Sequence, residues 1–296
     1  MPDNLFYQLG RKVGPKVRKA RWMWESMTGT EADAIRLEHG VGQDLANEAR
    51  RQLQMDADPR VRGLLDEVGD RLSDCVGNRL RSFHFEAFHS GQPNAFALPG
   101  GYIFVSRSIL DLVAGPPEPG NPPPARREQD SDASAEALGM SHGPLALGPA
   151  ETDWNRDEVA FILAHEMGHV IRGHAIERIV ANSAVSVLSR TTPVRGALGG
   201  WLRTAGVRVL ETAYSRDQES EADRLGVRLL MAADFAPEGS IRLLGRLAKL
   251  RAAASESETL DLGEYLSTHP TCGMRINRIR RYLAETGKTK PPSANR

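Results

Sequence analysis

The sequence is poor in cysteine, has no long apolar run and carries no excess of charge of either sign. Its two cysteines, Cys75 and Cys272, lie far apart and in no metal-ligand spacing, which argues against a disulfide scaffold and favours a reducing compartment. No run of about 18 apolar residues is present, so the sequence predicts no transmembrane helix. The 38 basic and 38 acidic side chains cancel, and this balance gives no electrostatic reason to expect a nucleic-acid partner.

Basic residues are nevertheless concentrated toward both ends. Residues 1–30 hold six basic side chains against two acidic ones, and four arginines follow one another between Arg275 and Arg281. Such clusters could touch an anionic membrane surface, although solvated helix faces explain them more simply. The first residues lack the apolar segment of a signal peptide. We therefore expect a cytoplasmic protein that could contact a membrane peripherally, and the sequence leaves its oligomeric state open.

Apolar residues at helical spacing predict a mostly helical protein. Helices are expected over residues 30–53, 59–76, 155–182, 201–232, 237–251 and 271–285. Between them, short aromatic and β-branched runs are separated by turn residues, over residues 83–86, 94–98 and 102–106. Such runs predict a small antiparallel sheet. The expected fold class is α+β and predominantly helical.

A proline-rich segment interrupts this pattern. Six prolines lie between Pro116 and Pro124, and residues 115–152 hold little apolar material to offset the entropy lost on ordering. We expect 115–152 to be a mobile insertion within a domain of residues 59–286. Residues 1–58 are expected to form a basic, helical extension, and residues 287–296 a disordered tail.

The helix expected to begin at the N-cap Asn155 carries the pattern His-Glu-x-x-His. Its histidines, His165 and His169, are four residues apart and share one face of a helix, so both imidazoles can reach one Zn²⁺. Glu166, beside the first histidine, can take a proton from the attacking water. The apolar run 159–164 indicates a buried helix, which disfavours a surface helix with two chance histidines.

A catalytic zinc normally takes three protein ligands and keeps one position open. The acidic segment 217–223 supplies candidates for the third ligand. Glu219 and Asp223 are four residues apart and share a helix face, so Glu219 could bind the metal while Asp223 orients a ligating imidazole. Glu221, two residues beyond Glu219, is the alternative ligand.

Four motifs together resemble one family of zinc metallopeptidases. They are Asn94–Gly101 (NAFALPGG), His165–His169 (HEMGH), Glu219–Asp223 (ExEAD) and Ser267–Pro270 (STHP), which occur in the family's order and span about residues 60–285. The family includes the bacterial heat-shock peptidase HtpX, the prenyl-protein (CaaX) endopeptidases, the periplasmic peptidase BepA and the mitochondrial inner-membrane stress peptidase. Tyr214-Ser215-Arg216, before the acidic motif, is most similar to the BepA and mitochondrial branch.

The resemblance implies a zincin-like domain of the gluzincin type. In such a domain His165, His169 and Glu219 would bind one Zn²⁺ per chain, and Glu166 would be the general base. The resemblance also implies that His269 and Arg275 lie near the metal, where they stabilise the transition state or occupy the site at rest. For His269, capping of the following helix is the alternative role.

The resemblance further implies an endopeptidase that acts on unfolded or misassembled protein substrates. An extended substrate can add to an edge strand, so Asn94, Ala95 and Phe96 are the predicted substrate-binding residues. One alternative is a zinc-stabilised, chaperone-like binding module whose site is gated by His269 and mostly latent. Another is a helical interaction protein with chance motifs. Cys272 is expected to be a buried, inert thiol, with a redox-sensitive role as the alternative.

Overall fold

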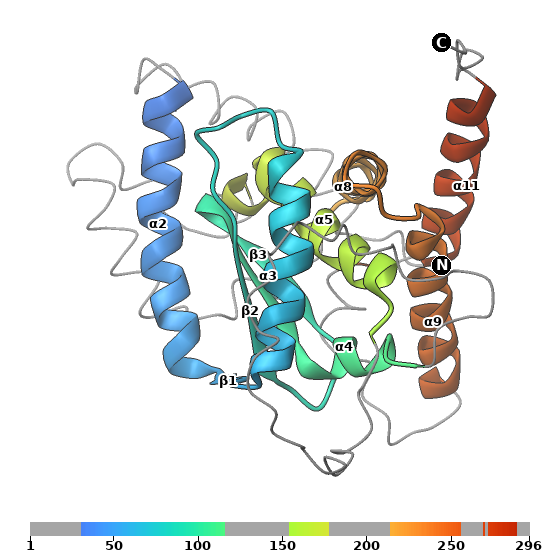
Figure 1. Cartoon of the computed structure of the whole chain (residues 1–296), viewed down its shortest axis with the longest axis horizontal. Coiled ribbons are helices and arrows are strands. Elements are labelled where there is room, and N and C mark those ends of the chain that lie inside the picture. The colour runs from blue at the N-terminus through green and yellow to red at the C-terminus, as the bar shows by residue number, and fades with distance from the viewer. Residues whose placement is uncertain (1–30, 116–153, 178–213, 256–268, 270–271, 289–296) are drawn as a thin grey trace, which may run out of the picture.

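The computed structural model describes residues 31–115, 154–177, 214–255, 269 and 272–288. The expectations for residues 1–30, for the insertion beyond Gly115 and for the tail from residue 289 lie outside these ranges. The helices are α2 (Glu31–Gln52), α3 (Pro59–Asp74), α4 (Arg107–Leu112), α5 (Arg156–Ile171), α8 (Arg216–Ala232), α9 (Glu238–Ser255) and α11 (Cys272–Lys288). The strands are β1 (Gln54–Met55), β2 (His84–His89), β3 (Ala95–Leu98) and β4 (Tyr102–Ser106), and the 3₁₀ turn η1 (Pro99–Gly101) joins the last two (Figure 1).

The sheet is small and mixed, in the order β1-β2-β4-β3. β1 pairs with β2 and β3 with β4 in antiparallel fashion, whereas β2 and β4 are parallel. The expectation of a purely antiparallel sheet is therefore wrong, while the α+β, predominantly helical class is confirmed. The physical reason is tertiary packing: β4 lies between β2 and β3 and pairs with both, so the two flanking strands do not pair with each other as neighbours in the sequence would.

The two faces of the sheet belong to two apolar clusters. Side chains of one face pack with α3 and α5, and they are Ala87, Ala95, Ala97, Ile103 and Val105. Side chains of the other face pack with α2, and they are Phe88, Phe96, Leu98, Tyr102 and Phe104. This alternation follows the two-residue period of a strand. α2 therefore covers one face of the sheet, and α3 with α5 covers the other (Figure 1).

The boundaries of α5 confirm one expectation and correct another. Asn155 is the N-cap, and its side-chain oxygen accepts a hydrogen bond from the Glu158 N–H at 3.2 Å. The helix ends at Ile171 and does not continue to residue 182 as expected. Gly173 has φ of 73°, a left-handed conformation that terminates helices and that glycine adopts without strain.

Other differences concern short or late-starting elements. The two-residue β1 and the short α4 were not expected from the sequence. α8 begins at Arg216, after the N-cap Ser215, whereas the expected helix began at residue 201, outside the part described. No described helix is long and apolar enough to cross a membrane.

Candidate metal centre

The helix α5 is enclosed on every side. Each residue from Glu158 to Val170 is buried, and His165, Glu166 and His169 are all 0% exposed. Polar side chains at such depth are costly unless they find polar partners. The partners come from α8, which makes the most extensive contact with α5.

Two glycines let α5 and α8 approach closely. A Cβ on Gly168 would lie 3.0 Å from the backbone of Ala222, and a Cβ on Gly226 would lie 3.2 Å from the backbone nitrogen of His165. Neither position has room for a side chain without a shift of backbone. This approach brings Glu219, which is 2% exposed, to the two histidines of α5.

Four side chains converge at this point and could hold a metal ion. Nitrogen or oxygen atoms of His165, His169, Glu219 and His269 all lie within 4.8 Å of one another. The Nε2 atoms of His165 and His169 are 3.2 Å apart, and Nε2 of His169 is 3.3 Å from Oε1 of Glu219. Ligands at 2.0–2.1 Å in a tetrahedron are separated by about 3.4 Å. The spacing therefore fits a tetrahedral metal site.

His269 completes the group from beyond α8. Its Nδ1 lies 3.3 Å from Nε2 of His165 and 2.7 Å from Oε1 of Glu219. Its side chain is 1% exposed. These two distances fit Nδ1 of His269 as a fourth metal ligand. They fit equally well a hydrogen bond between His269 and Glu219.

The carboxylate of Glu166 lies beside the four ligand atoms. Nε2 of His269 lies 3.5 Å from Oε1 of Glu166. Among the described residues, neither oxygen of Glu166 has a hydrogen-bond partner. A buried carboxylate without hydrogen-bond partners destabilises the folded protein. Such an arrangement is expected for a group that interacts with a reactant rather than with a protein side chain.

Asp223 and Arg275 support the ligands from behind. Oδ1 of Asp223 lies 3.1 Å from Nδ1 of His165, on the side of the ring away from the cluster. The Arg275 guanidinium, which is 2% exposed, donates to both oxygens of Asp223 at 2.7 and 2.9 Å. Its Nη1 also lies 3.0 Å from Oε2 of Glu219. Arg275 thus contacts both carboxylates contributed by α8.

His174 joins the site, although the sequence did not point to it. Its Nδ1 lies 3.0 Å from Nδ1 of His169, and its side chain is almost fully buried. Glu221, the alternative ligand, is outside the cluster: its carboxylate is 56% exposed and lies 3.7 Å from Nε2 of His174. A histidine five residues after the second ligand was the signal that could have identified His174. The ring of Tyr214, another neighbour, stacks on His169 with centroids 3.7 Å apart.

Burial and charge shift the ionisation of these groups. Burial holds the pKa of His169 well below its ordinary value, so the imidazole is neutral. For Glu219, burial alone would raise the pKa, but the electrostatic interactions with His269 and Arg275 outweigh it and hold the pKa well below the ordinary value. The same balance between burial and Arg275 lowers the pKa of Asp223. Neutral imidazole and ionised carboxylate are the forms that bind metal ions.

The predicted substrate-binding residues are buried. Asn94, Ala95 and Phe96 are 6%, 1% and 7% exposed. Asn94 precedes the edge strand β3, and Ala95 and Phe96 are its first two residues; β3 packs against α5. Cys272 is also buried, and burial raises the pKa of its thiol, as expected for an inert cysteine.

Comparison with known proteins agrees with this geometry. The mitochondrial metalloendopeptidase OMA1 of Saccharomyces cerevisiae is 27% identical over 207 residues, which cover 67% of this chain and 46% of that protein. The β-barrel assembly-enhancing protease of Yersinia pestis is 24% identical over 266 residues, or 85% of this chain and 46% of that protein. The metalloprotease YcaL of Escherichia coli is 28% identical over 241 residues, or 78% and 76% of the two chains. The chain thus spans less than half the length of the first two relatives.

A family model also matches the chain over residues 59–283, which include α3, the strands β2, β3 and β4, α5, α8, α9 and most of α11. Its description is peptidase family M48. The expected resemblance to the metallopeptidases is confirmed by this match. The chain belongs to peptidase family M48.

Proposed function

We propose that the chain is a zinc-dependent endopeptidase that hydrolyses peptide bonds of protein substrates. The observation that supports this most directly is the tetrahedral spacing of ligand atoms from α5 and α8 beside the buried Glu166. Zinc is proposed because it favours four-coordinate sites made of imidazole and carboxylate. One ion per chain agrees with the single cluster of this kind among the described residues.

In this proposal His165, His169 and Glu219 bind the metal, and Glu166 is the general base. Bound zinc polarises the scissile carbonyl and lowers the pKa of the attacking water. Glu166 accepts a proton from that water and then delivers it to the leaving amine. Both of its oxygens are available for the transfer, since no described side chain hydrogen-bonds to them.

Asp223 and Arg275 act through the ligands. Asp223 accepts a hydrogen bond from Nδ1 of His165, which leaves Nε2 of the same ring as the metal-binding atom. Arg275 contacts both Asp223 and Glu219 and so reduces the repulsion between two buried carboxylates. We propose that Arg275 is a positioning residue, because its guanidinium is engaged by these carboxylates.

The place of His269 favours a second candidate function, a gated and mostly latent site that binds unfolded chains and rarely cuts them. A zinc site closed by four protein ligands is structural rather than catalytic, and Nδ1 of His269 has the spacing of a fourth ligand. For peptidase activity, this imidazole would have to leave the position that a substrate carbonyl needs. His269 could then serve the reaction by stabilising the developing oxyanion.

The proposed substrates are unfolded or misassembled proteins. β3 lies at the edge of the sheet next to α5, and an extended substrate could hydrogen-bond to its backbone. Since Asn94, Ala95 and Phe96 are buried, their main chain and not their side chains would form this wall.

Both cysteines are free, which supports a reducing compartment. A location in the cytoplasm, with peripheral membrane contact, stays our prediction.

The proposal is tested by metal content and casein cleavage in the wild type and in Glu166→Gln. Zinc should be present at one ion per chain in both proteins, and only the wild type should cleave, because the amide cannot accept the proton. We expect the rate to fall by at least about a hundredfold. Near-wild-type cleavage by Glu166→Gln would exclude Glu166 as the base, and absence of zinc from both would exclude the metal site.

His269→Ala separates the two candidate functions. If His269 closes the site at rest, its removal should raise casein cleavage severalfold while zinc content stays at one ion per chain. Loss of cleavage with zinc retained would instead assign His269 to the reaction itself. Cleavage unchanged from the wild type would contradict both roles.

A further inference from the structure

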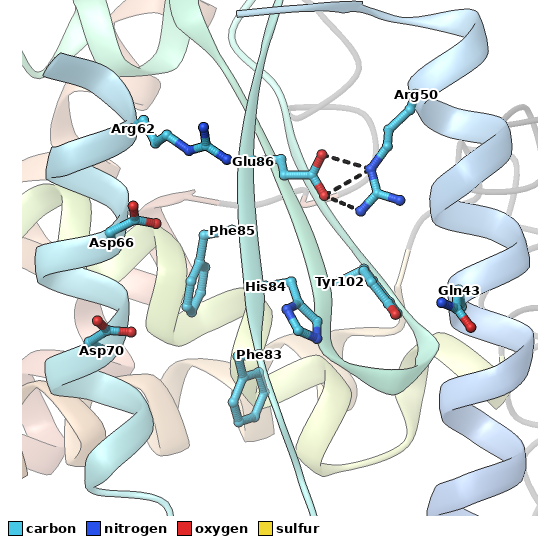
Figure 2. A pocket seen from close by; sticks show the side chains of 10 residues that line it. All are labelled: Gln43, Arg50, Arg62, Asp66, Asp70, Phe83, His84, Phe85, Glu86 and Tyr102. Atoms are coloured by element: carbon cyan, nitrogen blue, oxygen red, sulfur yellow. Dashed lines mark hydrogen bonds and ion pairs between the residues drawn. The ribbon is translucent and has the colours of Figure 1, made fainter. Parts of the chain in front are cut away.

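A second concave site lies away from the metal centre. It is a cavity of about 580 Å³ between α2 and α3, and it shares no residue with the metal-binding cluster. Figure 2 shows β2 running through the middle of the cavity, with α3 on one side and α2 on the other. A volume of this size is within the usual range of binding sites, about 300–1,000 Å³.

The edge of β2 is open along this cavity. β1 pairs only with Phe88 and His89 at the end of β2, and the Asp56 N–H donates to the Ala87 carbonyl at 2.9 Å. Peptide groups of alternate residues in a strand point to the same side, so those of Phe85 point the same way as those of Ala87. No strand among the described residues covers this side of β2 before Ala87. The N–H and C=O of Phe85 therefore face the cavity.

The walls of the cavity differ in charge. On the α2 side, Arg50 and Glu86 form an ion pair, with Nε of Arg50 2.8 Å from Oε2 of Glu86. On the α3 side, Asp66 and Asp70 are exposed, one helical turn apart, and neither has an ion-pair partner in the part of the chain that the structure describes. Among the described residues that line that wall, Arg62 is the only cation, so carboxylates are in excess there.

Aromatic residues complete the site without adding positive charge. The rings of Phe83 and Phe85 stack with centroids 6.5 Å apart and are only partly buried. Partial desolvation, together with the nearby His39, lowers the pKa of His84, which favours the neutral imidazole. Apolar rings next to carboxylates suit lysine and arginine, whose apolar stems pack on such surfaces while the charged ends stay near water.

We propose that this cavity binds an extended segment of another protein that carries lysine or arginine, as an additional strand on β2. The segment would form two main-chain hydrogen bonds with Phe85. Its side chains would alternate between the α2 and α3 walls, and a basic side chain directed toward α3 would lie near Asp66 and Asp70. The site is separate from the metal centre, so it holds a polypeptide without cutting it.

The test uses a capped, fluorescein-labelled hexapeptide of alternating lysine and valine as the probe. Its binding to the full chain is followed by fluorescence anisotropy in the Glu166→Gln form, in which the probe should stay uncut. Asp66→Lys should weaken binding at least fivefold. Glu67→Lys should change it less than twofold, because Glu67 is the neighbour of Asp66 on α3 and makes the same charge change outside the cavity. Equal effects of the two variants would overturn the proposal.

Two N-methylated forms of the probe test strand addition itself. Alternate peptide nitrogens of a strand face opposite ways, so methylation of one alternate set should weaken binding at least tenfold and methylation of the other set should not. Equal binding by both forms, or no binding of the parent peptide at 1 mM (about −4 kcal/mol), would exclude strand addition. Binding that emerges only after deletion of residues 1–30 would show that the chain fills the site itself, and would overturn the external partner.

Discussion

At the scale of single residues, the orientation of His169 depends on a side chain outside the cluster. Nε2 of His169 faces the other ligand atoms, so a neutral ring carries its proton on Nδ1. Nδ1 of His174 lies 3.0 Å from Nδ1 of His169 and must then accept a hydrogen bond from the Nδ1–H group of His169. Its own proton is consequently on Nε2, toward the carboxylate of Glu221. A hydrogen bond to the far nitrogen fixes both the tautomer and the plane of a metal-binding imidazole.

Replacement of His174 should therefore weaken metal binding without unfolding the protein. We expect His174→Ala to raise the zinc dissociation constant by about 10–100-fold. His174→Asn is the matched control, because its amide oxygen can accept the hydrogen bond and should keep most of the affinity. Competition with a chromophoric chelator measures the constants, and far-UV circular dichroism verifies the fold. Equal affinity in His174→Ala and the wild type would disprove the positioning role.

Some residues of the metal site can be predicted from their spacing in the sequence, and others cannot. The two histidines of α5, and likewise Glu219 and Asp223, share a face because the helix fixes side chains four residues apart. His174 was not predicted, because it approaches His169 only after the turn at Gly173. The left-handed conformation of Gly173 leaves no periodic pattern in the sequence. Arg275 was predicted near the metal, but its pairing with two carboxylates of α8 depends on tertiary packing.

At the scale of secondary structure, the contact between α5 and α8 decides whether the ligands can meet. Gly168 lies against the backbone of Ala222, one helical turn after Glu219 on α8. A larger side chain at Gly168 would push α8 outward and with it Glu219. The metal site therefore depends on a close helix packing at two glycines that are not themselves ligands.

We expect Gly168→Val to lower the free energy of unfolding by about 1–3 kcal/mol, the usual cost of overpacking. It should also weaken zinc binding, because Glu219 moves away from the histidines. Gly63→Val provides the control: Gly63 is on the exposed face of α3, and a Cβ there meets nothing within 4 Å. Urea denaturation and zinc titration measure the two effects. Equal stability of the two variants would contradict the proposed packing constraint.

The sheet shows the limit of prediction at this scale. Residues 94–98 and 102–106 were predicted as strands, and they form the antiparallel pair β3–β4. The parallel pairing of β2 with β4 was missed because local turn residues say nothing about which distant strand takes the centre. Both β3 and β4 are fully buried, between α2 on one side and α5 on the other, so burial alone does not set that order and tertiary packing decides it.

At the scale of the whole molecule, the metal would join segments that lie far apart in the sequence. His165 and His169 belong to α5, Glu219 to α8, and His269 precedes α11. An ion that binds only the folded state adds stability according to its saturation, about 4 kcal/mol at a thousandfold excess over the dissociation constant.

Removal of the metal should accordingly lower the melting temperature by on the order of 10 °C. Differential scanning calorimetry before and after treatment with 1,10-phenanthroline measures the change, and added zinc should restore the original value. The Glu166→Gln variant should show the same shift, because Glu166 is not a proposed ligand. A melting temperature that is insensitive to the chelator would contradict a metal site in this position.

The late position of Arg275 has a consequence for synthesis. The neighbouring carboxylates of Glu219 and Asp223 both contact this guanidinium, and it follows them in the chain by about fifty residues. A nascent chain that has released α5 and α8 from the ribosome still lacks the charge that balances them. The metal site can therefore assemble only after Arg275 has been made and has packed against α8.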